Sequence, residues 1–600
     1  MARAFRVVAG TMLLVGTAIA CATAERPHFD QDRADADADA PPAFGGDGGD
    51  GCASTELVCS RDLHAVLDAC TREVVETCPP EMGCAEGRCV PACASAEANK
   101  GTVGCTFWTI PSSGEMYEDE TGACFAASIT NTWSMPVGIE AEYDGAPLDI
   151  SKSTFIPHVT GDKIDYEPLE GPLPPGQVAI IFLSQASILR PSAIRCPRPA
   201  AMDENPLPFG SGRGHAFRLS TDFPVSAYSV FPYGGAASAI SAATVLLPLS
   251  SWGQNYLMVD GWDANEVDEA KSRAAIQIVA AYDDTRVKIG DEVAGTFSDA
   301  SAPGTTELTL SKGEVLQLLQ RRNFTGKPVE ADKPIALFGG ADCFDVPPKI
   351  KYCDSAHQQI PPLAAWGNEY VAVRYRNRAD LWFGEGSAAA DETVPWRIVG
   401  AADDTTLTYE PERPPTAPLK LAQGESRIFW AEKPFVVRSQ DSAHPFYLAG
   451  YMTGADSDGT QKIGDPDFVN IVPADQYLDS YVFFADVTYE FTTLTVIRRN
   501  DGAGFADVTL DCAGVLHGWR KLDGSPADGT GRFEYTYVDL VRHGDPQPYA
   551  GGGTCGSGRH EMKSDGPFGV TVWGLAPYDS YAYPGGAGLR PLSNVRVPVK

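Results

Sequence analysis

From about residue 94 onward, apolar and polar residues alternate in short runs separated by turn-forming residues. Alternation with a period of two is typical of β-strands that have one buried face. In Ile276–Ile289 and again in Trp396–Tyr409, two such runs flank an Asp-Asp-Thr turn. Leu494–Leu510 follows the same plan with an Asn-Asp-Gly turn. We predict a β-hairpin in each segment, because short turns rich in Asp, Asn and Gly join antiparallel strands.

A second recurring pattern consists of an acidic residue, any residue, proline and an apolar residue. Each copy precedes a run with the composition of a strand, such as VSAYSVF or FGVTVWG. Proline has no backbone donor, so we expect it at the first position of a strand. The four copies are Asp222–Val225, Asp332–Ile335, Glu432–Phe435 and Asp565–Phe568.

A third pattern is proline, an aromatic residue four positions later and a tyrosine four positions after that. Successive copies lie 114 and 111 residues apart, which indicates a repeated structural unit. We expect these aromatic residues to pack in cores or between modules rather than to form a ligand platform. The copies are Pro248, Trp252 and Tyr256, then Pro362, Trp366 and Tyr370, then Pro473, Tyr477 and Tyr481.

These repeats predict an all-β fold of about four tandem modules, each with roughly five to seven strands. The predicted modules span residues 94–252, 253–366, 367–477 and 478–600. They follow a small disulfide-rich segment at residues 52–93. A row of β-sandwich-like modules and a closed, propeller-like ring both satisfy the period.

The first 20 residues have the composition of a secretion signal. Arg3 and Arg6 precede the apolar run Val7–Ala20, which is too short to span a bilayer comfortably. Cys21 follows small residues, as in a bacterial lipobox, although Ala18 stands where leucine is usual. We predict lipidation at Cys21 and export to the outer membrane or cell surface. Ordinary cleavage without lipidation is the alternative.

Residues 21–51 are rich in Asp, Ala, Pro and Gly and lack any apolar period. We predict a disordered acidic linker there, because such a composition buries too little surface to fold. The whole chain has a net charge of −32. This charge repels nucleic acid and anionic lipid, so the prediction is no nucleic-acid partner and membrane attachment only through the lipid anchor.

The chain has 15 cysteines, and 14 remain when Cys21 is set aside. An even number in an exported protein suits complete disulfide pairing. Because residues 52–93 contain seven, at least one must pair outside that segment, and Cys105 is the nearest candidate. Disulfide partners are expected among Cys52, Cys59, Cys70, Cys78, Cys84, Cys89, Cys93, Cys105, Cys124, Cys196, Cys343, Cys353, Cys512 and Cys555.

Motifs for catalysis are missing from the sequence: there is no G-x-S-x-G turn, H-E-x-x-H pair or P-loop, and no G-x-G-x-x-G on a strand-turn-helix unit. We therefore predict a protein that is not an enzyme and has no catalytic residues or cofactor. The alternative is an extracellular polysaccharide hydrolase, whose two carboxylates would carry no recognisable spacing among 79 acids. Asp-Ser-Ala-His occurs twice, ending at His357 and His444, and we interpret both copies as turns capped by Asp.

Acidic loops make calcium the most credible metal, although the main prediction is no metal. Asp456 and Asp458, followed by Asp465 and Asp467, offer one set of clustered oxygen ligands. A second set includes Asp260 and Asp263. Neither matches the full twelve-residue calcium loop with its terminal glutamate, so solvated loops are expected.

Several stretches resemble the IgGFc-binding protein N-terminal domain family. They are GCTFWTI from Gly104, PPGQVAIIFL from Pro174 and, most specifically, NFTGKPVEADKPIALFGGADCFDVP from Asn323. The resemblance extends over residues 94–600 and includes bacterial, myxobacterial-type surface lipoproteins. It implies an extracellular binding or adhesion ectodomain whose ligand is a glycan, a protein or an envelope component. A purely structural envelope protein is a further alternative.

Overall fold

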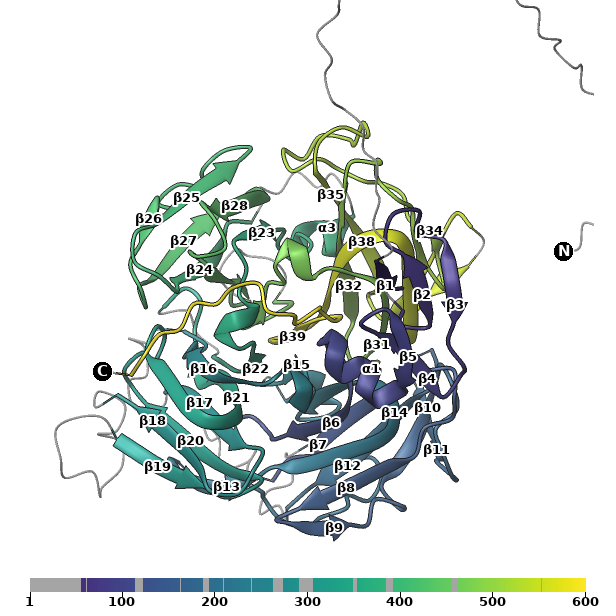
Figure 1. Ribbon diagram of the computed structural model, residues 1–600, viewed down its shortest axis with the longest axis vertical. Coiled ribbons are helices and arrows are strands. Elements are labelled where there is room, and N and C mark those ends of the chain that lie inside the picture. Colours follow the sequence, from purple (N-terminus) through teal and green to yellow (C-terminus); the bar gives the residue numbers. More distant parts are fainter. Residues whose placement is uncertain are drawn as a thin grey trace, which may run out of the picture. The chain divides into compact units, whose positions relative to one another are not determined.

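Strands form almost all of the regular structure in the described part of the chain (Figure 1). The computed structural model describes residues 56–599 except 61, 114–121, 162, 187–193, 209, 239, 263–272, 291–305, 349–352, 385–391, 456–461 and 552. The predicted signal peptide, Cys21, the acidic linker and Cys52 lie outside the described residues. The described residues belong to one compact unit, Ser54–Lys600. None of their helices is long and apolar enough to cross a bilayer.

The cysteine-rich segment folds into small elements with little apolar core. β1 (Leu57–Cys59), β2 (Ala65–Asp68) and β3 (Val74–Thr77) form an antiparallel sheet. β4 (Met82–Ala85) and β5 (Arg88–Pro91) form a hairpin, and α1 (Ala92–Asn99) follows. The segment's own buried cluster contains only Val66, Cys78 and Cys84, so crosslinks rather than burial stabilise it.

The first large module is one nine-stranded sheet. Its longest strand, β14 (Phe217–Phe231), pairs with four others of the sheet. The remaining strands are β6 (Val103–Thr109), β7 (Phe125–Asn131), β8 (Ile139–Tyr143), β9 (Ala146–Leu148), β10 (Thr154–Thr160), β11 (Lys163–Pro168), β12 (Val178–Ser184) and β15 (Ala242–Val245).

The second module is an eight-stranded sheet around the long strand β21 (Pro328–Phe344). One of its strands, β13 (Gly212–His215), precedes β14 in the chain but pairs with β20 (Glu314–Gln320). The first two modules are therefore interleaved. The other strands are β16 (Gly253–Leu257), β17 (Ala274–Ala280), β18 (Thr285–Ile289), β19 (Thr306–Leu310) and β22 (Asp354–Ile360).

The third module has two four-stranded sheets and a short helix. One sheet contains β23 (Glu369–Ala372), β25 (Thr405–Glu410), β26 (Lys420–Leu421) and β28 (Phe435–Ser439). The other contains β24 (Val394–Gly400), β27 (Ser426–Ala431), β29 (Phe446–Met452) and β30 (Asp467–Asn470). The helix α3 (Arg378–Phe383) begins after Asn377, whose side chain accepts the Ala379 N–H at 2.8 Å.

The fourth module is a nine-stranded sheet around β38 (Gly558–Ala576), the longest strand described. Its other strands are β31 (Leu478–Ala485), β32 (Phe491–Arg499), β33 (Val508–Leu510), β34 (Gly514–Val515), β35 (Phe533–Arg542), β36 (Asp545–Pro548), β37 (Thr554–Cys555) and β39 (Asp579–Pro584).

The three predicted hairpins contain strands and turns, but the two strands of each do not pair with each other. β17 and β18 follow each other through a turn, and both pair with β21 at different points along it. β32 and β33 share β38 in the same way, while β24 and β25 lie in different sheets. The hairpin prediction is therefore wrong, because alternation reports which residues are strands but not which strand pairs with which.

Three of the four acid-x-Pro motifs lie inside a long strand instead of at its start. Pro224, Pro334 and Pro567 lie within β14, β21 and β38, and the pairing register shifts beside each of them. A residue without a backbone donor fits a bulge, where the ladder is interrupted, as well as it fits a strand start. Pro434 alone matches the prediction, since β28 begins at the next residue.

The modules contribute one short strand each, β15, β22, β30 and β39, to a common junction, and we call them the inner strands. Figure 1 labels β15, β22 and β39 near the middle of the molecule. β15 contacts β22 and β39, and β30 contacts the same two strands. Polar side chains join them: Ser355 Oγ donates to the Ile240 carbonyl at 2.6 Å, and Gln358 Nε2 donates to the Ala243 and Ala582 carbonyls at 2.9 and 3.0 Å. The prediction of an all-β, multi-module chain is confirmed. Within the described residues every sheet stays open, so none closes into a ring.

Residues 585–599, the C-terminal strap, run back across earlier modules (Figure 1). The Leu589 N–H donates to the Lys100 carbonyl, and the Leu592 N–H donates to the Ala364 carbonyl, both at 2.8 Å. Val597 exchanges two 2.8 Å hydrogen bonds with the side chain of Asn255. The strap thus joins the last described residues to the end of α1 and to the second module.

Candidate functional site

Every cysteine among the described residues is disulfide-bonded. Cys93 pairs with Cys105, so the odd cysteine of the cysteine-rich segment bonds outside it, to the nearest candidate. Cys70 is also disulfide-bonded. The other pairs are Cys59–Cys84, Cys78–Cys89, Cys124–Cys196, Cys343–Cys353 and Cys512–Cys555.

The repeated Pro-aromatic-Tyr motif forms three short 3₁₀ turns, each fixed by its tyrosine. The Tyr256 hydroxyl accepts the Gly253 N–H at 2.9 Å and donates to the Ile335 carbonyl at 2.7 Å. Tyr370 and Tyr481 bond in the same way, to the carbonyls of Phe446 and Phe568. All three tyrosines are buried, so their polar ends are satisfied inside the protein and present nothing to a ligand.

The aromatic residue in the middle of the motif differs between the copies. Trp252 and Trp366 are buried in hydrophobic cores, where neither ring is available as a platform for a ligand. The Trp252 Nε1–H donates to the Leu247 carbonyl at 2.9 Å, and the Trp366 Nε1–H donates to the Pro361 carbonyl at 3.1 Å. Each indole thus bonds to the residue just before its motif proline. Tyr477 does not reproduce this bond, because its hydroxyl is buried and has no partner among the described residues. The three copies are therefore equivalent in backbone and tyrosine but not in this side chain.

The first two of these turns also pack against the next one, a feature that the sequence analysis missed. A Cβ on Gly253 would lie 2.6 Å from Cβ of Pro362, and one on Gly367 would lie 2.6 Å from Cβ of Pro473. In these two copies glycine follows the aromatic residue because no side chain fits beneath the next proline. The Trp-Gly pairs of the first two copies are the sequence signal that could have shown it.

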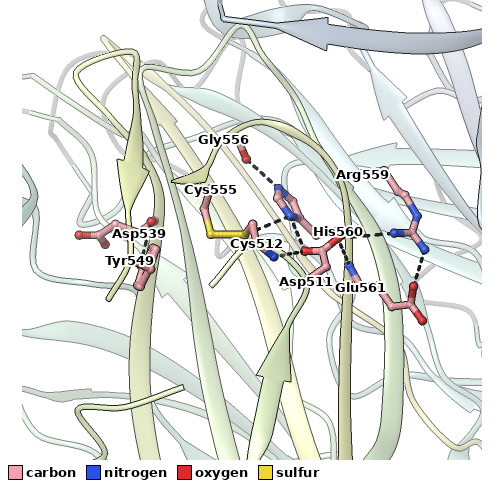
Figure 2. The surroundings of a disulfide bond; sticks show 9 residues. All are labelled: Asp511, Cys512, Asp539, Tyr549, Cys555, Gly556, Arg559, His560 and Glu561. Atoms are coloured by element: carbon pink, nitrogen blue, oxygen red, sulfur yellow. Dashed lines mark hydrogen bonds and ion pairs between the residues drawn. A yellow bond between two sulfur atoms is a disulfide. The ribbon is translucent and has the colours of Figure 1, made fainter. Parts of the chain in front are cut away.

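One set of three potential metal ligands lies close together in the described residues: Asp511, Cys512 and His560 (Figure 2). The Cys512 sulfur is bonded to Cys555, so it offers no thiolate. His560 Nδ1 lies 3.1 Å from Asp511 Oδ1, and Nε2 lies 2.7 Å from the Gly556 carbonyl oxygen. Burial is the largest single influence and raises the pKa of Asp511, but the hydrogen bond and charge of His560 and the backbone N–H groups of Glu561 and Cys512 together lower that pKa below its usual value. The arrangement braces the disulfide and has the chemistry of a structural ion pair.

Asp260, one of the weak calcium candidates, is used for structure. Its carboxylate is fully buried and lies 2.7 Å from Nη1 of Arg397. It also accepts the Phe324 N–H at 2.6 Å and the Thr325 hydroxyl at 2.8 Å. Protein donors already satisfy this carboxylate, so Asp260 is part of a buried ion pair and not of the solvated loop that the sequence predicted. Asp263, Asp456 and Asp458 lie outside the described residues.

Four buried aspartates gather where the inner strands begin, and we call them the buried aspartate cluster. Asp354, Asp467 and Asp579 are the first residues of β22, β30 and β39, and Asp465 lies two residues before β30. Each is at most 1% exposed. Burial and then the negative charges of the other three raise the pKa of Asp354 well above its usual range. Burial raises the pKa of Asp579 to about 7 despite hydrogen bonds from Ser241 and Tyr489.

An exposed edge strand lies in the cysteine-rich segment. β3 is at one edge of its sheet, and among the described strands it pairs only with β2. All four of its residues are exposed, including Val74 at 61% and Val75 at 57%. An apolar strand edge with unpaired backbone groups is a surface to which another chain can add.

Comparison with known proteins places most of these modules in one family. A family model described as IgGFc binding protein matches residues 242–574, more than half of the chain. The chain belongs to this family. A human relative, named IgGFc-binding protein, is 26% identical over 395 residues. The match to this IgGFc-binding relative covers 64% of the present chain but only 6% of the human protein. No solved structure matches the chain.

The structure shows which strands and buried aspartates lie inside the part of the chain that matches the IgGFc-binding family. The match begins at Ala242, the first residue of β15, and ends at Gly574 in β38. It therefore contains Asp354, Asp465 and Asp467, whereas Asp579 and the edge strand β3 lie outside it. β3 is thus a feature of this chain beside its family modules.

Proposed function

We propose that this chain is an exported, lipid-anchored protein of the bacterial, myxobacterial type that displays its β modules at the cell surface and binds an extracellular protein or glycan. Membership of the IgGFc-binding family supports extracellular binding, and the human relative is named for binding the Fc part of immunoglobulin G. The disulfides suit an oxidising compartment. Cys21, after an apolar signal, supports lipid anchoring at the outer membrane.

The observation that carries the binding proposal is the exposed apolar edge of β3. Val74 and Val75 point to opposite faces of a strand, yet both are more than half exposed. A partner that adds a strand along β3 would satisfy its outer backbone groups and bury both valines. Each fully buried valine contributes about 1.5–3 kcal/mol relative to exposure, enough to influence affinity strongly.

The binding test uses the full exported chain, purified and immobilised. Probes are the immunoglobulin G Fc fragment and a glycan array, read by surface plasmon resonance and fluorescence. We expect at least one probe to bind. Because only a polypeptide can add a strand along β3, the double variant Val74→Asp with Val75→Asp should weaken binding of the Fc fragment at least about tenfold. Leu419→Asp, a similarly exposed apolar site in the third module, is the matched control. Binding that the double variant leaves unchanged would exclude β3 as the contact surface.

The same preparation is offered a panel of polysaccharides. Turnover of any of them would contradict a binding function alone and favour a hydrolase. The anchor is tested in cells with a palmitate analogue: Cys21→Ser should lose the label and release the protein from the membrane fraction. Membrane association of Cys21→Ser equal to that of the parent chain would refute lipid anchoring.

A further inference from the structure

The buried aspartate cluster has no part in the proposed binding surface, and it contains an unusual pattern of hydrogen bonding. In Asp354, Asp465 and Asp467, one carboxylate oxygen accepts a backbone N–H, from Ser355, Ala455 and Phe468 at 2.7, 3.2 and 2.7 Å. The second oxygen, Oδ2 in all three, is buried and has no hydrogen-bond partner among the described residues. In each of these three buried carboxylates, therefore, one oxygen accepts a backbone hydrogen bond and the other has no donor among the described residues.

An unsatisfied buried acceptor costs about 1–3 kcal/mol, and an unpaired buried charge costs more. Three such acceptors at the ends of neighbouring strands would oppose folding unless something compensates for them. Arg378 lowers the pKa of Asp465, but its guanidinium is already paired with Glu392 at 2.6 Å. The three Oδ2 atoms thus have no donor among the described residues.

Contacts between the inner strands bring these residues together from two modules and place Asp579 of a third beside them. Ser580 Oγ donates to the Asp465 carbonyl at 2.7 Å, which sets the start of β39 beside Asp465. Asp579 is held by Ser241 and Tyr489, so its own oxygens are satisfied. Asp354 and Asp465 each lie eight residues before the motif proline, Pro362 and Pro473. The repeat therefore delivers a carboxylate to equivalent positions, while the first module has Ile240 there.

We propose that the junction of the inner strands binds one calcium ion through Oδ2 of Asp354, Asp465 and Asp467, with Asp579 adding negative charge beside it. Oxygen-only ligands select a hard cation, and calcium accepts six to eight oxygens in flexible geometry. Magnesium needs a tighter octahedral shell. Among the described residues, the three oxygens are not gathered within 4.8 Å as the ligand atoms around His560 are. Calcium therefore draws the strand ends together and couples the modules that supply them.

The test uses the full exported chain, stripped with EDTA and dialysed. Calcium chloride is titrated by calorimetry, and the thermal unfolding midpoint is measured without metal, with calcium and with magnesium, each at about 1 mM. We expect one calcium per chain and a midpoint that rises with calcium concentration, because a ligand that binds only the folded state stabilises it. Calorimetry without binding heat, together with an unchanged midpoint, would overturn the proposal. Equal effects of magnesium and calcium would overturn the assignment to calcium.

Two variants, Asp354→Asn and Asp467→Asn, separate a ligand from a structural residue. Each should weaken calcium affinity at least about tenfold and abolish the calcium-dependent rise of the midpoint. Without calcium, each should unfold at the same temperature as the stripped parent chain or higher, since removing one negative charge relieves repulsion. Asp203→Asn, at an exposed position, is the control and should respond to calcium as the parent does. Variants that keep the full calcium response would contradict the assigned ligands, whereas the proposed binding through β3 would be unaffected.

Discussion

His357 is buried in β22 between an aromatic ring and an amide. Its ring stacks on Phe338 with centroids 5.0 Å apart and planes inclined by 10°. Its Nε2 lies 2.8 Å from Oε1 of Gln277, so the Nε2–H of the neutral ring donates a hydrogen bond to that oxygen. Burial lowers the pKa of His357 to about 3. The imidazole is therefore neutral in the folded chain throughout the physiological range.

This histidine makes stability depend on pH. The pKa is depressed on folding from about 6.5 to about 3, so the unfolded chain binds more protons between these values. The free energy of unfolding is unaffected by this histidine above pH 6.5. As the pH falls below 6.5, His357 lowers that free energy, by roughly 3 kcal/mol at pH 4. We predict that His357→Gln removes this loss, measured as the difference in urea unfolding free energy between pH 7 and pH 4. His444→Gln is the control, and a His357→Gln variant with the parent's pH slope would contradict the prediction.

The long strands β14, β21 and β38 organise their modules at the scale of the element. On one edge of each strand the partner changes at the proline, from β8 to β7, from β18 to β17 and from β33 to β32. On the other edge one strand, β6, β16 or β31, pairs on both sides of the proline with a shifted register. The proline stands where the ladder is interrupted, and the strand can change partners there because no backbone donor is lost. Asp332, two residues before Pro334, fixes the bulge by accepting the Arg286 N–H at 2.8 Å.

The free energy of unfolding should accordingly depend on whether proline lies at the bulge of β21 or in its paired part. Pro334→Ala is expected to cost less than about 1 kcal/mol, since only chain stiffness changes. Ala341→Pro is expected to cost about 3 kcal/mol or more, because Ala341 pairs with Ala274 on one side and Ala356 on the other. Urea unfolding of the two variants measures both losses. Equal costs would show that the position of the bulge does not matter.

Local pattern predicted the elements of this fold well and their partners poorly. The strands, the turns and the local pairing of Cys343 with Cys353 follow from nearby residues. The Asp-Ser-Ala-His copies show the limit: Asp441 does cap a turn, accepting the Ala443 N–H at 2.9 Å, but Asp354 begins a buried strand. Packing between modules decides that difference. The buried aspartate cluster was missed as a unit for the same reason, since Asp579 joins it from a distant part of the chain.

At the scale of the whole molecule, contacts between distant modules hold the described unit together. The Tyr228 hydroxyl, in the first module, donates to the Gly585 carbonyl beyond β39 at 2.8 Å. Arg397 in the third module pairs with Asp260 in the second, and both side chains are fully buried. Breaking such a buried pair typically costs about 3–5 kcal/mol. The modules are thus expected to unfold together rather than one at a time.

The C-terminal strap should be a major part of this coupling. Ending the chain after Gly586 removes Leu589, Val597 and their hydrogen bonds to Lys100 and Asn255. We predict a lower calorimetric midpoint and a split of the single transition, because earlier modules lose the segment that joins them. Asn255→Ala, which removes the two bonds to Val597 and a longer one of 3.4 Å to the Val329 carbonyl, should cost roughly 1–3 kcal/mol and keep one transition. A truncated chain that unfolds at the parent's midpoint in a single transition would show that the inner strands alone couple the modules.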